Sequence, residues 1–572
     1  MDIKRNALLV ALAVVSYLML LAWNEDYPVE SAMDDATVTD LASGAAADRI
    51  PSVPESGAQT TSSTDDLPQV PVATAQPSDT PDTTAQPALP ENRLITINTP
   101  KQHVTIDLLG GDIVEVSLPD FPVSLEAQDQ PFRLLRQDAN MVYIAQSGLI
   151  GRNGPDGSAD GRPLYSASDS SYEITSGEAT VDLSYTAANG VEITKRFTFD
   201  ADDYLIGVQY LVDNQSGQPW QANMYGQIKR NSAPDPSDNG NFSLRTFLGA
   251  AITTDDDPYV KYELEDIDDG VTPIEKTGGW ITFSQHYFLG GWIPDGDSVN
   301  TFTLRRNSAG EYLLTFVNPP VVVAPGQTGS IEADFWAGPK DQYRLEEVSP
   351  NLELTIDYGM FTFIASPIFW LLTQINDAIG NYGVSILLMT LIIKIILYPL
   401  SAKSLKSMAK MRKLAPKINA IKEKCGDDKQ KFMQEQMALW KKEQVNPFGG
   451  CLPMLLQMPV FLGIYWVLNE SVELRQASFI LWYDDLSKMD PYFILPLLMG
   501  AAMFLQQSIT PMQTADPAQA KMMKFMPVIF TVFFLWFPAG LVLYYTANSV
   551  LSILQQWIVT KQVEKTYKPK GT

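Results

Sequence analysis

The sequence predicts an α-helical, polytopic membrane bundle of six spans, five of them in a core, joined to a large periplasmic all-β sandwich. Apolar stretches occur at the start and throughout the last third of the 572 residues. Charge is divided in the same way, because residues 24–357 hold 18 basic and 52 acidic residues, net −34, whereas residues 358–572 hold 21 and 13, net +8. Between the apolar regions, hydrophobic and polar residues alternate as they do in half-buried strands.

Residues 1–23 predict an uncleaved membrane anchor with its N-terminus in the cytoplasm. Residues 7–23 are almost wholly apolar, and the basic residues Lys4 and Arg5 precede them. A secretory signal peptide has a similar outline but ends in a small-x-small cleavage site, whereas an acidic stretch follows Trp23. Basic residues before the apolar run favour a cytoplasmic N-terminus.

Residues 24–90 predict a disordered, acidic, proline-rich tether. They contain nine prolines and twelve acidic residues, but only one basic and one aromatic residue. A segment of this composition cannot bury enough apolar surface to offset its conformational entropy, so we expect no packed structure in it.

Residues 91–357 predict the β-sandwich. Hydrophobic and polar residues alternate in the stretch VDLSY at 181–185 and again at 191–195. The dipeptide Asn189-Gly190 lies between these two stretches, which is typical of a β-hairpin. Many short alternating stretches separated by turn residues indicate a large sandwich.

Residues 358–380 predict an amphipathic helix that lies in the membrane interface. The stretch is long enough to be a span, but it contains Pro367, Gln374 and Asp377. Its several aromatic residues suit the headgroup region instead. A span at this point would also move the most basic loop of the chain to the outer side, against the positive-inside tendency.

Five further spans are predicted within residues 381–572, which form the core. They cover residues 382–400, 451–468, 492–509, 522–537 and 540–559, and most have a length that crosses a bilayer. With the N-terminal anchor, they place every basic loop and both termini in the cytoplasm. The acidic segments then lie in the periplasm.

The loop at residues 401–448 carries a net charge of +7 and predicts a cytoplasmic helical hairpin. Apolar residues recur every three or four positions on both sides of Gly426, with Lys and Arg between them. The hairpin is either a solvated spacer or a mobile basic arm for ribosomal RNA and incoming chains.

Lys394 is a charged residue inside the predicted span 382–400. An ionised lysine at the centre of a helix costs roughly 2.5–3.5 kcal/mol and normally faces a bundle interior or a wet cavity. The alternative is that its long side chain snorkels to the cytoplasmic interface. Thr390 lies one turn away on the same face, and Gln457 adds an amide in another span. We therefore expect a hydrated groove among the helices that opens to the cytoplasm.

No catalytic or metal-binding constellation is present in the sequence, so we expect neither a cofactor nor enzyme activity. The two cysteines, Cys425 and Cys451, and the two histidines, His103 and His286, form no metal-binding cluster. No phosphate-binding GxxxxGK[ST] loop occurs. The net charge of −34 on residues 24–357 would repel phosphates, which argues against general DNA binding. Two alternatives stay open: a transporter, and a membrane-tethered carbohydrate-binding protein in which a histidine and a carboxylate of the β domain form an acid–base pair.

Three stretches of the last third carry distinctive motifs. Residues 446–459 read NPFGGCLPMLLQMP, residues 525–530 read FMPVIF, and residues 538–545 read PAGLVLYY. They resemble the third span and the last two spans of the YidC/Oxa/Albino family of membrane protein insertases. The resemblance covers residues 358–572, and the N-terminal span, tether and β domain resemble the long Gram-negative form of the family.

The resemblance implies an insertase and chaperone that moves nascent proteins into the bacterial inner membrane through a hydrophilic groove, alone or with the Sec translocon. The cation of the groove corresponds to Lys394, where many relatives carry arginine. The family's cytoplasmic positions tied to targeting factors and the ribosome correspond to Asp427 and Asp516. The implied partners are nascent membrane proteins, the ribosome, the Sec translocon and the lipid bilayer. The substrate-contact positions correspond to Leu452, Pro453, Met458, Pro459, Phe533, Trp536 and Tyr545.

Overall fold

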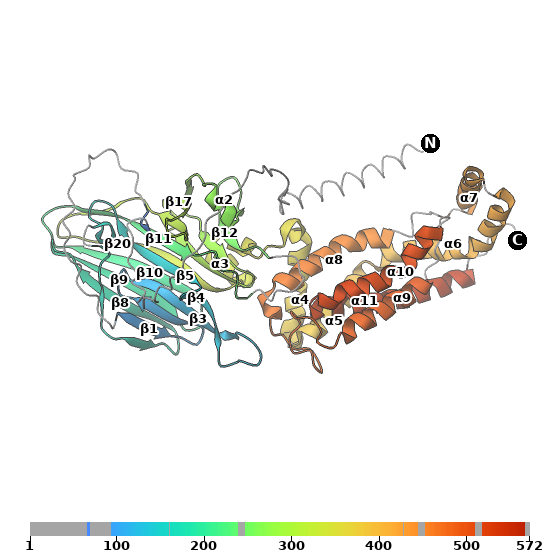
Figure 1. Ribbon diagram of the computed structural model, residues 1–572, viewed down its shortest axis with the longest axis horizontal. Coiled ribbons are helices and arrows are strands. Elements are labelled where there is room, and N and C mark those ends of the chain that lie inside the picture. The colour runs from blue at the N-terminus through green and yellow to red at the C-terminus, as the bar shows by residue number, and fades with distance from the viewer. Residues whose placement is uncertain are drawn as a thin grey trace, which may run out of the picture. The chain divides into compact units, whose positions relative to one another are not determined.

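The computed structural model describes residues 66–68, 93–158, 161–237, 246–426, 428–443, 445, 452–509 and 517–566 (Figure 1). The predicted anchor at 1–23 and most of the predicted tether lie outside these ranges. The described residues 93–566 form a β domain and a helical domain. The β domain comprises residues 93–357, and the helical domain comprises residues 359–566.

The larger sheet of the β domain contains eleven described strands. Neighbouring strands are antiparallel, except that β1 and β7 are parallel. A short strand, β19 (Val321–Val323), pairs with one end of β11. In spatial order the other strands are β14 (Ile274–Thr277), β17 (Val299–Arg306), β18 (Tyr312–Val317), β11 (Trp220–Arg230), β5 (Val142–Ile150), β4 (Pro131–Gln137), β3 (Asp112–Pro122), β2 (His103–Asp107), β1 (Leu94–Asn98) and β7 (Ser171–Glu173).

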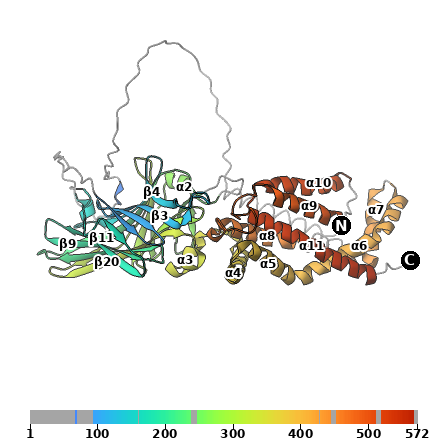
Figure 2. The same cartoon turned by 90° about the horizontal axis from the view of Figure 1, so that it is seen from below.

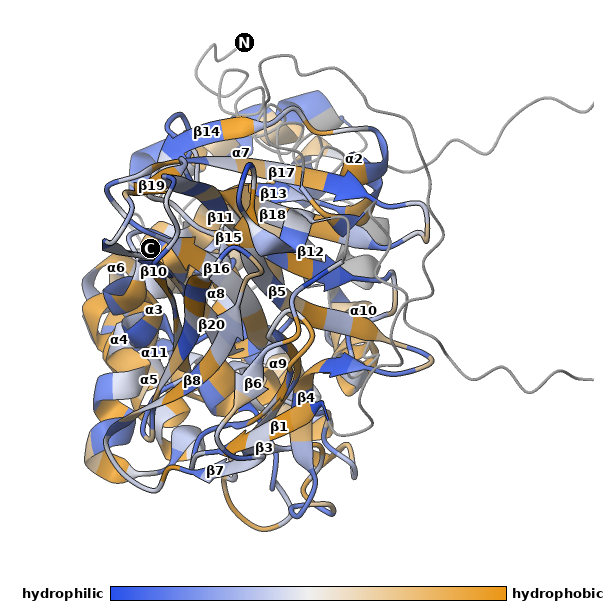
Figure 3. Cartoon of the chain, turned by 90° about the vertical axis from the view of Figure 1, so that its left-hand side faces the viewer, coloured by the Kyte–Doolittle hydropathy of each residue, from blue (hydrophilic) through white to orange (hydrophobic). Residues whose placement is uncertain are grey.

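The second sheet contains nine described strands, all antiparallel to their neighbours. The predicted hairpin at Asn189-Gly190 is confirmed, because β8 and β9 pair on either side of it. Hydrophobic and hydrophilic residues follow each other along the strands (Figure 3). The spatial order is β13 (Val260–Tyr262), β12 (Gly249–Ile252), β15 (Ile281–Ser284), β16 (Phe288–Pro294), β20 (Thr328–Pro339), β10 (Leu205–Asn214), β9 (Val191–Asp200), β8 (Glu178–Thr186) and β6 (Ser166–Ala167).

The two sheets face each other across an apolar core. Phe132 of the larger sheet stacks on Phe288 of the second, with ring centroids 4.4 Å apart. The buried ring of Trp292 lies so close to Gly226 that a Cβ atom on this glycine would come within 2.7 Å of it. Gly226 therefore permits the close packing of β11 and β16. Two short helices complete the domain, α2 (Leu264–Asp268) and α3 (Gln342–Val348).

The helical domain contains eight described α-helices. Helix α11 packs against α5, α6 and α9, whereas α4 packs against α5 and α8. Helices α9 and α10 lie side by side in both views (Figures 1 and 2). The helices are α4 (Thr362–Ile379), α5 (Tyr382–Ile396), α6 (Tyr398–Cys425), α7 (Lys429–Glu443), α8 (Leu452–Glu470), α9 (Ile494–Ile509), α10 (Pro517–Phe533) and α11 (Ala539–Thr566).

The structure differs from the sequence-based segments at the end of α5. The segment predicted over 382–400 ends as a helix at Ile396, and the chain resumes as α6 after Leu397 with a bend of 68°. Pro399 lies in the first turn of α6. Proline lacks an N–H and is tolerated in a first turn but not in a helix interior, so the new helix begins there.

By length and hydropathy, none of the single helices within the described ranges qualifies as a membrane span. The bent pair of α5 and α6 qualifies when taken together. Ile494–Ile509 and Lys524–Trp536 are apolar but shorter than a span requires. The predicted count of six spans therefore stays a prediction.

The structure places two segments whose composition alone predicted no position. Helix α4 lies within the predicted interfacial segment 358–380 and ends at Gly380, whose φ of 72° is left-handed. Its position in a membrane interface stays a prediction. Residues 66–68 belong to the predicted tether, but they lie against the β domain. Asp66 pairs with Lys229, and Leu67 packs on apolar residues of the sheet. The overall composition of the tether did not predict these contacts.

Candidate functional site

Lys394 lies near the end of α5, a helix whose other residues in that region are apolar. The helix begins at Asn381, whose side chain accepts a hydrogen bond from the N–H of Val384 at 3.0 Å. This cap satisfies a backbone donor that would otherwise have no partner. Thr390, one turn before Lys394, is buried and donates its hydroxyl to the carbonyl of Ile386 at 2.6 Å. Thr390 therefore satisfies the backbone of its own helix.

The ammonium group of Lys394 contacts a hydroxyl on another helix. Its Nζ donates to Oγ of Ser552 on α11 at 2.8 Å. The Ser552 hydroxyl in turn donates to the carbonyl of Asn548 at 2.7 Å. Lys394 has no carboxylate within ion-pairing distance among the residues that the structure describes. A partly buried cation is thus held by a neutral hydroxyl, and no acid in the described part of the chain pairs with its charge.

Ser552 is the residue of the candidate site that sequence reasoning missed. Sequence offered a weak signal, because Ser552 is one of several polar residues in an apolar helix. The structure also brings Gln555, one turn further along α11, within 2.6 Å of the Ser401 hydroxyl at the start of α6. The two contacts fix α11 against both sides of the bend at Leu397.

Two other predicted site residues also meet at α11. Gln457 of α8 hydrogen-bonds to the hydroxyl of Tyr544. The ring of Tyr545 packs edge-on against Phe461 of α8, with centroids 4.8 Å apart, and against Phe534, at 4.9 Å. Ser552 follows Tyr544 by eight residues, which is about 12 Å along a helix. Helix α11 therefore connects Lys394 with Gln457 through contacts about two turns apart.

The predicted substrate-contact residues are apolar and partly open to the surface. Met458 on α8, Phe533 at the end of α10 and Trp536 in the following turn are 47%, 44% and 47% exposed. Pro459 lies inside α8, next to Met458. An exposed apolar side chain can contact an apolar chain or lipid without desolvating a polar group.

The remaining predicted site residues are described only in part. Leu452 and Pro453 are located in the first turn of α8, and the structure describes their backbone alone. Asp427 and Asp516 lie outside the described residues.

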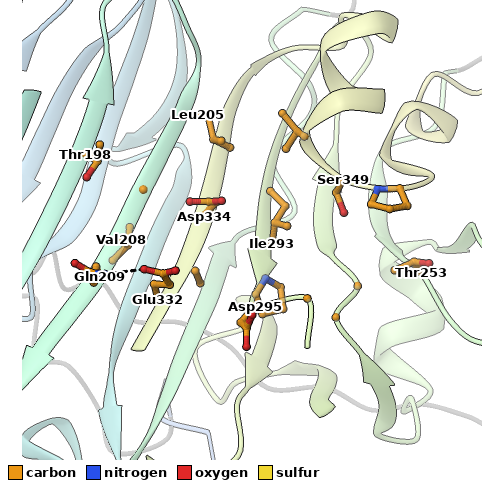
Figure 4. Close-up of a pocket in the computed structure, with 18 of the residues that line it drawn as sticks. Thr198, Leu205, Val208, Gln209, Thr253, Ile293, Asp295, Glu332, Asp334 and Ser349 are labelled. Atoms are coloured by element: carbon orange, nitrogen blue, oxygen red, sulfur yellow. Dashed lines mark hydrogen bonds between the residues drawn. The ribbon is translucent and has the colours of Figure 1, made fainter. Parts of the chain in front are cut away.

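The β domain contains a cavity of about 810 Å³ whose lining includes six acidic residues (Figure 4). In the close-up, Glu332 and Asp334 extend from β20, and Gln209 of β10 donates to Glu332 at 2.7 Å. Burial, and secondarily the charge of Glu332, raises the pKa of Asp334 to about 6. The carboxylates of the lining are Glu178, Asp200, Asp203, Asp295, Glu332 and Asp334.

The two histidines do not form an acid–base pair in this cavity. Neither His103 nor His286 is among its lining residues. His103 is exposed on β2 in the larger sheet, whereas His286 is buried in the turn between β15 and β16 of the second sheet. The alternative in which a histidine and a carboxylate form an acid–base pair for sugar chemistry therefore has no geometric basis at this cavity.

Two family models match the chain. The model described as "YidC periplasmic domain" matches residues 94–371, and the model described as "60Kd inner membrane protein" matches residues 374–566. The first match includes the β domain, and the second includes both Lys394 and Ser552.

Two similar proteins match over nearly their whole length. The chain is 48% identical over 566 residues to "Membrane protein insertase YidC" of Pseudomonas fluorescens (strain SBW25), with 99% of each chain covered. It is 48% identical over 576 residues to the protein of the same description from Stutzerimonas stutzeri (strain A1501), with 100% of each covered. A solved structure described as "Active YidC insertase crystal structure with the first transmembrane domain resolved" matches at 18% identity and a TM-score of 0.35, over 82% of this chain and 92% of that chain.

Proposed function

Because the chain belongs to the YidC family of membrane protein insertases, which are not enzymes, we propose that it inserts its clients through a hydrated groove around Lys394. The family is that of an inner-membrane protein with a periplasmic domain. In this groove Lys394 is the cation, Thr390 and Gln457 are the polar residues of the lining, and the apolar residues of α8 and α10 form the surface over which apolar client segments slide.

The mechanism follows from the cost of moving polar chain across hydrocarbon. A translocated tail that carries acidic residues leaves water reluctantly, because a charged side chain at the bilayer centre costs several kcal/mol. A hydrated groove that reaches partway across shortens the dry part of its path. The ammonium of Lys394 attracts the negative charges of the tail, and no covalent step is needed.

Apolar client segments need a different surface. Met458, Phe533 and Trp536 expose large apolar side chains. A hydrophobic segment can pass over such residues into lipid without breaking hydrogen bonds, and a flexible thioether such as that of Met458 adapts to many sequences. Leu452, Pro453, Pro459 and Tyr545 complete the proposed client-contact set.

The observation that carries the proposal is the environment of Lys394. Among the described residues, its only hydrogen-bond partner is the Ser552 hydroxyl, so its charge is available to attract a client carboxylate. A buried lysine that stabilises the fold is normally held by an acid or by several backbone carbonyls, as Lys195 of the β domain is held by three.

The topology and partners are part of the same proposal. Six spans would place both termini and the basic helices α6 and α7 in the cytoplasm. Their positive charge suits the RNA surface of a ribosome, and Asp427 and Asp516 would lie in loops on that side. The nascent membrane protein, the Sec translocon and the lipid bilayer would be the other partners.

The test is insertion by the purified protein reconstituted in lipid vesicles. Lys394→Ala should slow insertion of a client with an acidic tail by a factor of about 5 to 30, since a screened charge attraction is worth about 1–2 kcal/mol. Lys394→Arg keeps the charge and should insert normally, and Ser552→Ala should show a smaller loss. A matched client with a neutral tail is the control.

Two results would count against the proposal. Equal insertion of the acidic-tail client by the Lys394→Ala variant would remove the role of the charge. An equal loss of insertion rate for clients with acidic and neutral tails would show that Lys394 stabilises the fold and does not attract the client's charge.

A further inference from the structure

Residues 66–68 lie against the β domain, although 24 residues separate them from Arg93, the next described residue. The Asp66 residue is only 8% exposed. One of its carboxylate oxygens lies 2.8 Å from Nζ of Lys229, and the other accepts a hydrogen bond from the side-chain amide of Asn307 at 2.7 Å. Both oxygens of this carboxylate are therefore bound by the domain.

Leu67 adds an apolar and a backbone contact. Its side chain packs on a small cluster formed by Ile150, Tyr225 and Val317. Its carbonyl oxygen accepts a hydrogen bond from Arg305 at 3.2 Å. These groups come from β5, β11, β18 and β17, which are consecutive neighbours in the larger sheet.

The receiving groups are held in place by the β domain itself. Glu311 lies 2.7 Å from Lys229 and accepts a hydrogen bond from the Asn307 amide at 2.9 Å. The backbone N–H of Glu311 donates to the side-chain oxygen of Asn307 at 2.8 Å. Lys229 and Asn307 are thus positioned by residues other than Asp66, which is the arrangement of a preformed site.

We propose that this face of the larger sheet is a binding site for a short acidic–apolar peptide, and that its ligand is the chain's own Asp66-Leu67-Pro68. Lys229 and Asn307 recognise the carboxylate, Arg305 binds the following carbonyl, and the apolar cluster accepts the leucine. Together, the charge, backbone and apolar contacts select a peptide in which an acidic residue is followed directly by leucine.

The site changes how the N-terminal segment is connected to the β domain. Without it, 69 residues separate Trp23 from Arg93, the start of the described domain. With Asp66 bound, 42 residues separate Trp23 from this attachment to the sheet. The site therefore limits the distance that the β domain can move from the segment before it.

The test measures whether the site is filled by its own chain. A labelled peptide of residues 64–69, TDDLPQ, is titrated against the full-length protein in detergent and followed by fluorescence anisotropy. A tethered ligand has an effective concentration in the millimolar range, so it should exclude free peptide from the wild-type protein. Removal of the tethered ligand by Asp66→Asn with Leu67→Ala should strengthen peptide binding by roughly tenfold or more.

Matched controls separate recognition from unspecific charge effects. Asp65→Asn removes the neighbouring acidic charge and should behave like the wild type. A peptide with asparagine in place of Asp66 should bind the emptied protein roughly tenfold more weakly, since a charge-assisted hydrogen bond is lost. Lys229→Met in the emptied protein should abolish binding. Asn307→Ala should weaken binding, and this variant serves as the test if the Lys229→Met protein does not fold.

Equal peptide binding by the wild-type and emptied proteins would overturn the proposal, because the site would then not be held by residues 66–68. Absence of binding to the emptied protein would overturn it as well. Binding that appears only after the tethered ligand is removed, and that depends on Lys229, is the result expected.

Discussion

Asp334 is a residue at which burial and a neighbouring negative charge act in the same direction on the pKa. Burial comes first and the neighbouring Glu332 second among the causes that raise its pKa to about 6. The ordinary value of an aspartate is 3.8, so between about pH 4 and pH 6 the folded protein holds a proton that the unfolded chain has released. The stability of the β domain should therefore fall as the pH rises through this range, and the cost is fully present above pH 6.

We predict that Asp334→Asn stabilises the β domain at neutral pH. Removing the buried charge should raise the free energy of unfolding by about 1–3 kcal/mol at pH 7 and leave it unchanged at pH 4. Thermal unfolding of the full-length protein in detergent, followed at both values of pH, measures the difference. Asp202→Asn, at an exposed position of the same domain, is the matched control. A gain that is the same at both values of pH would contradict the explanation.

Some residues of the candidate site could be predicted from the sequence and others could not. Lys394 was recognisable because an ionised residue in an apolar run is rare and costly. Ser552 was not, because serine is common in helices and its partner lies 158 positions away. The apolar contact residues, such as Met458, came from the resemblance to a family rather than from any physical signal of their own.

Helix α6 is the element whose position depends on a few specific contacts. Its first turns pack through Ala402, Leu405 and Ala409 against the end of α11. Nζ of Lys413 donates to the carbonyl of Glu564 at 2.8 Å, in the last turns of α11. A cation at the C-terminal end of a helix stabilises its unpaired carbonyls and its dipole.

We predict that Lys413→Met loosens the end of α11 without unfolding the bundle. The loss of a cation at a helix terminus is worth about 0.3–1 kcal/mol, so amide hydrogen exchange in residues 559–566 should be about two to five times faster. Lys406→Met, which removes an exposed cation from the same helix, should leave exchange there unchanged. Equal effects of both variants would show that total charge matters rather than this contact.

The bend before α6 illustrates what hydropathy cannot locate. The apolar run continues past Ile396 to Leu400, so the sequence predicted one segment. The structure ends α5 at Ile396 because a new helix begins with Pro399 in its first turn. The break between α6 and α7 was easier to place, since Gly426 interrupts the apolar repeat.

At the scale of the whole molecule, composition and periodicity predicted the division into a β part and a helical part. Alternation identified strands such as β8 and β9, whose hairpin turn is local in sequence. The order of the strands could not be predicted from the sequence, because strands that are not consecutive in the chain pair with each other. For example, β11 lies between β5 and β18. Such pairings depend on packing between residues far apart in the chain, which no local pattern encodes.

The central claim is that Lys394 faces water inside the membrane, and thiol labelling tests it most directly. In a background with Cys425→Ser and Cys451→Ser, Lys394→Cys and Ile395→Cys would each be treated with a charged, membrane-impermeant thiol reagent in membrane vesicles. The two positions have nearly the same depth but lie on different faces of α5, and Ile395 is 63% exposed on the helix surface. We predict rapid labelling at position 394 and slow labelling at position 395, whereas equal rates at the two positions, fast or slow, would contradict a hydrated groove.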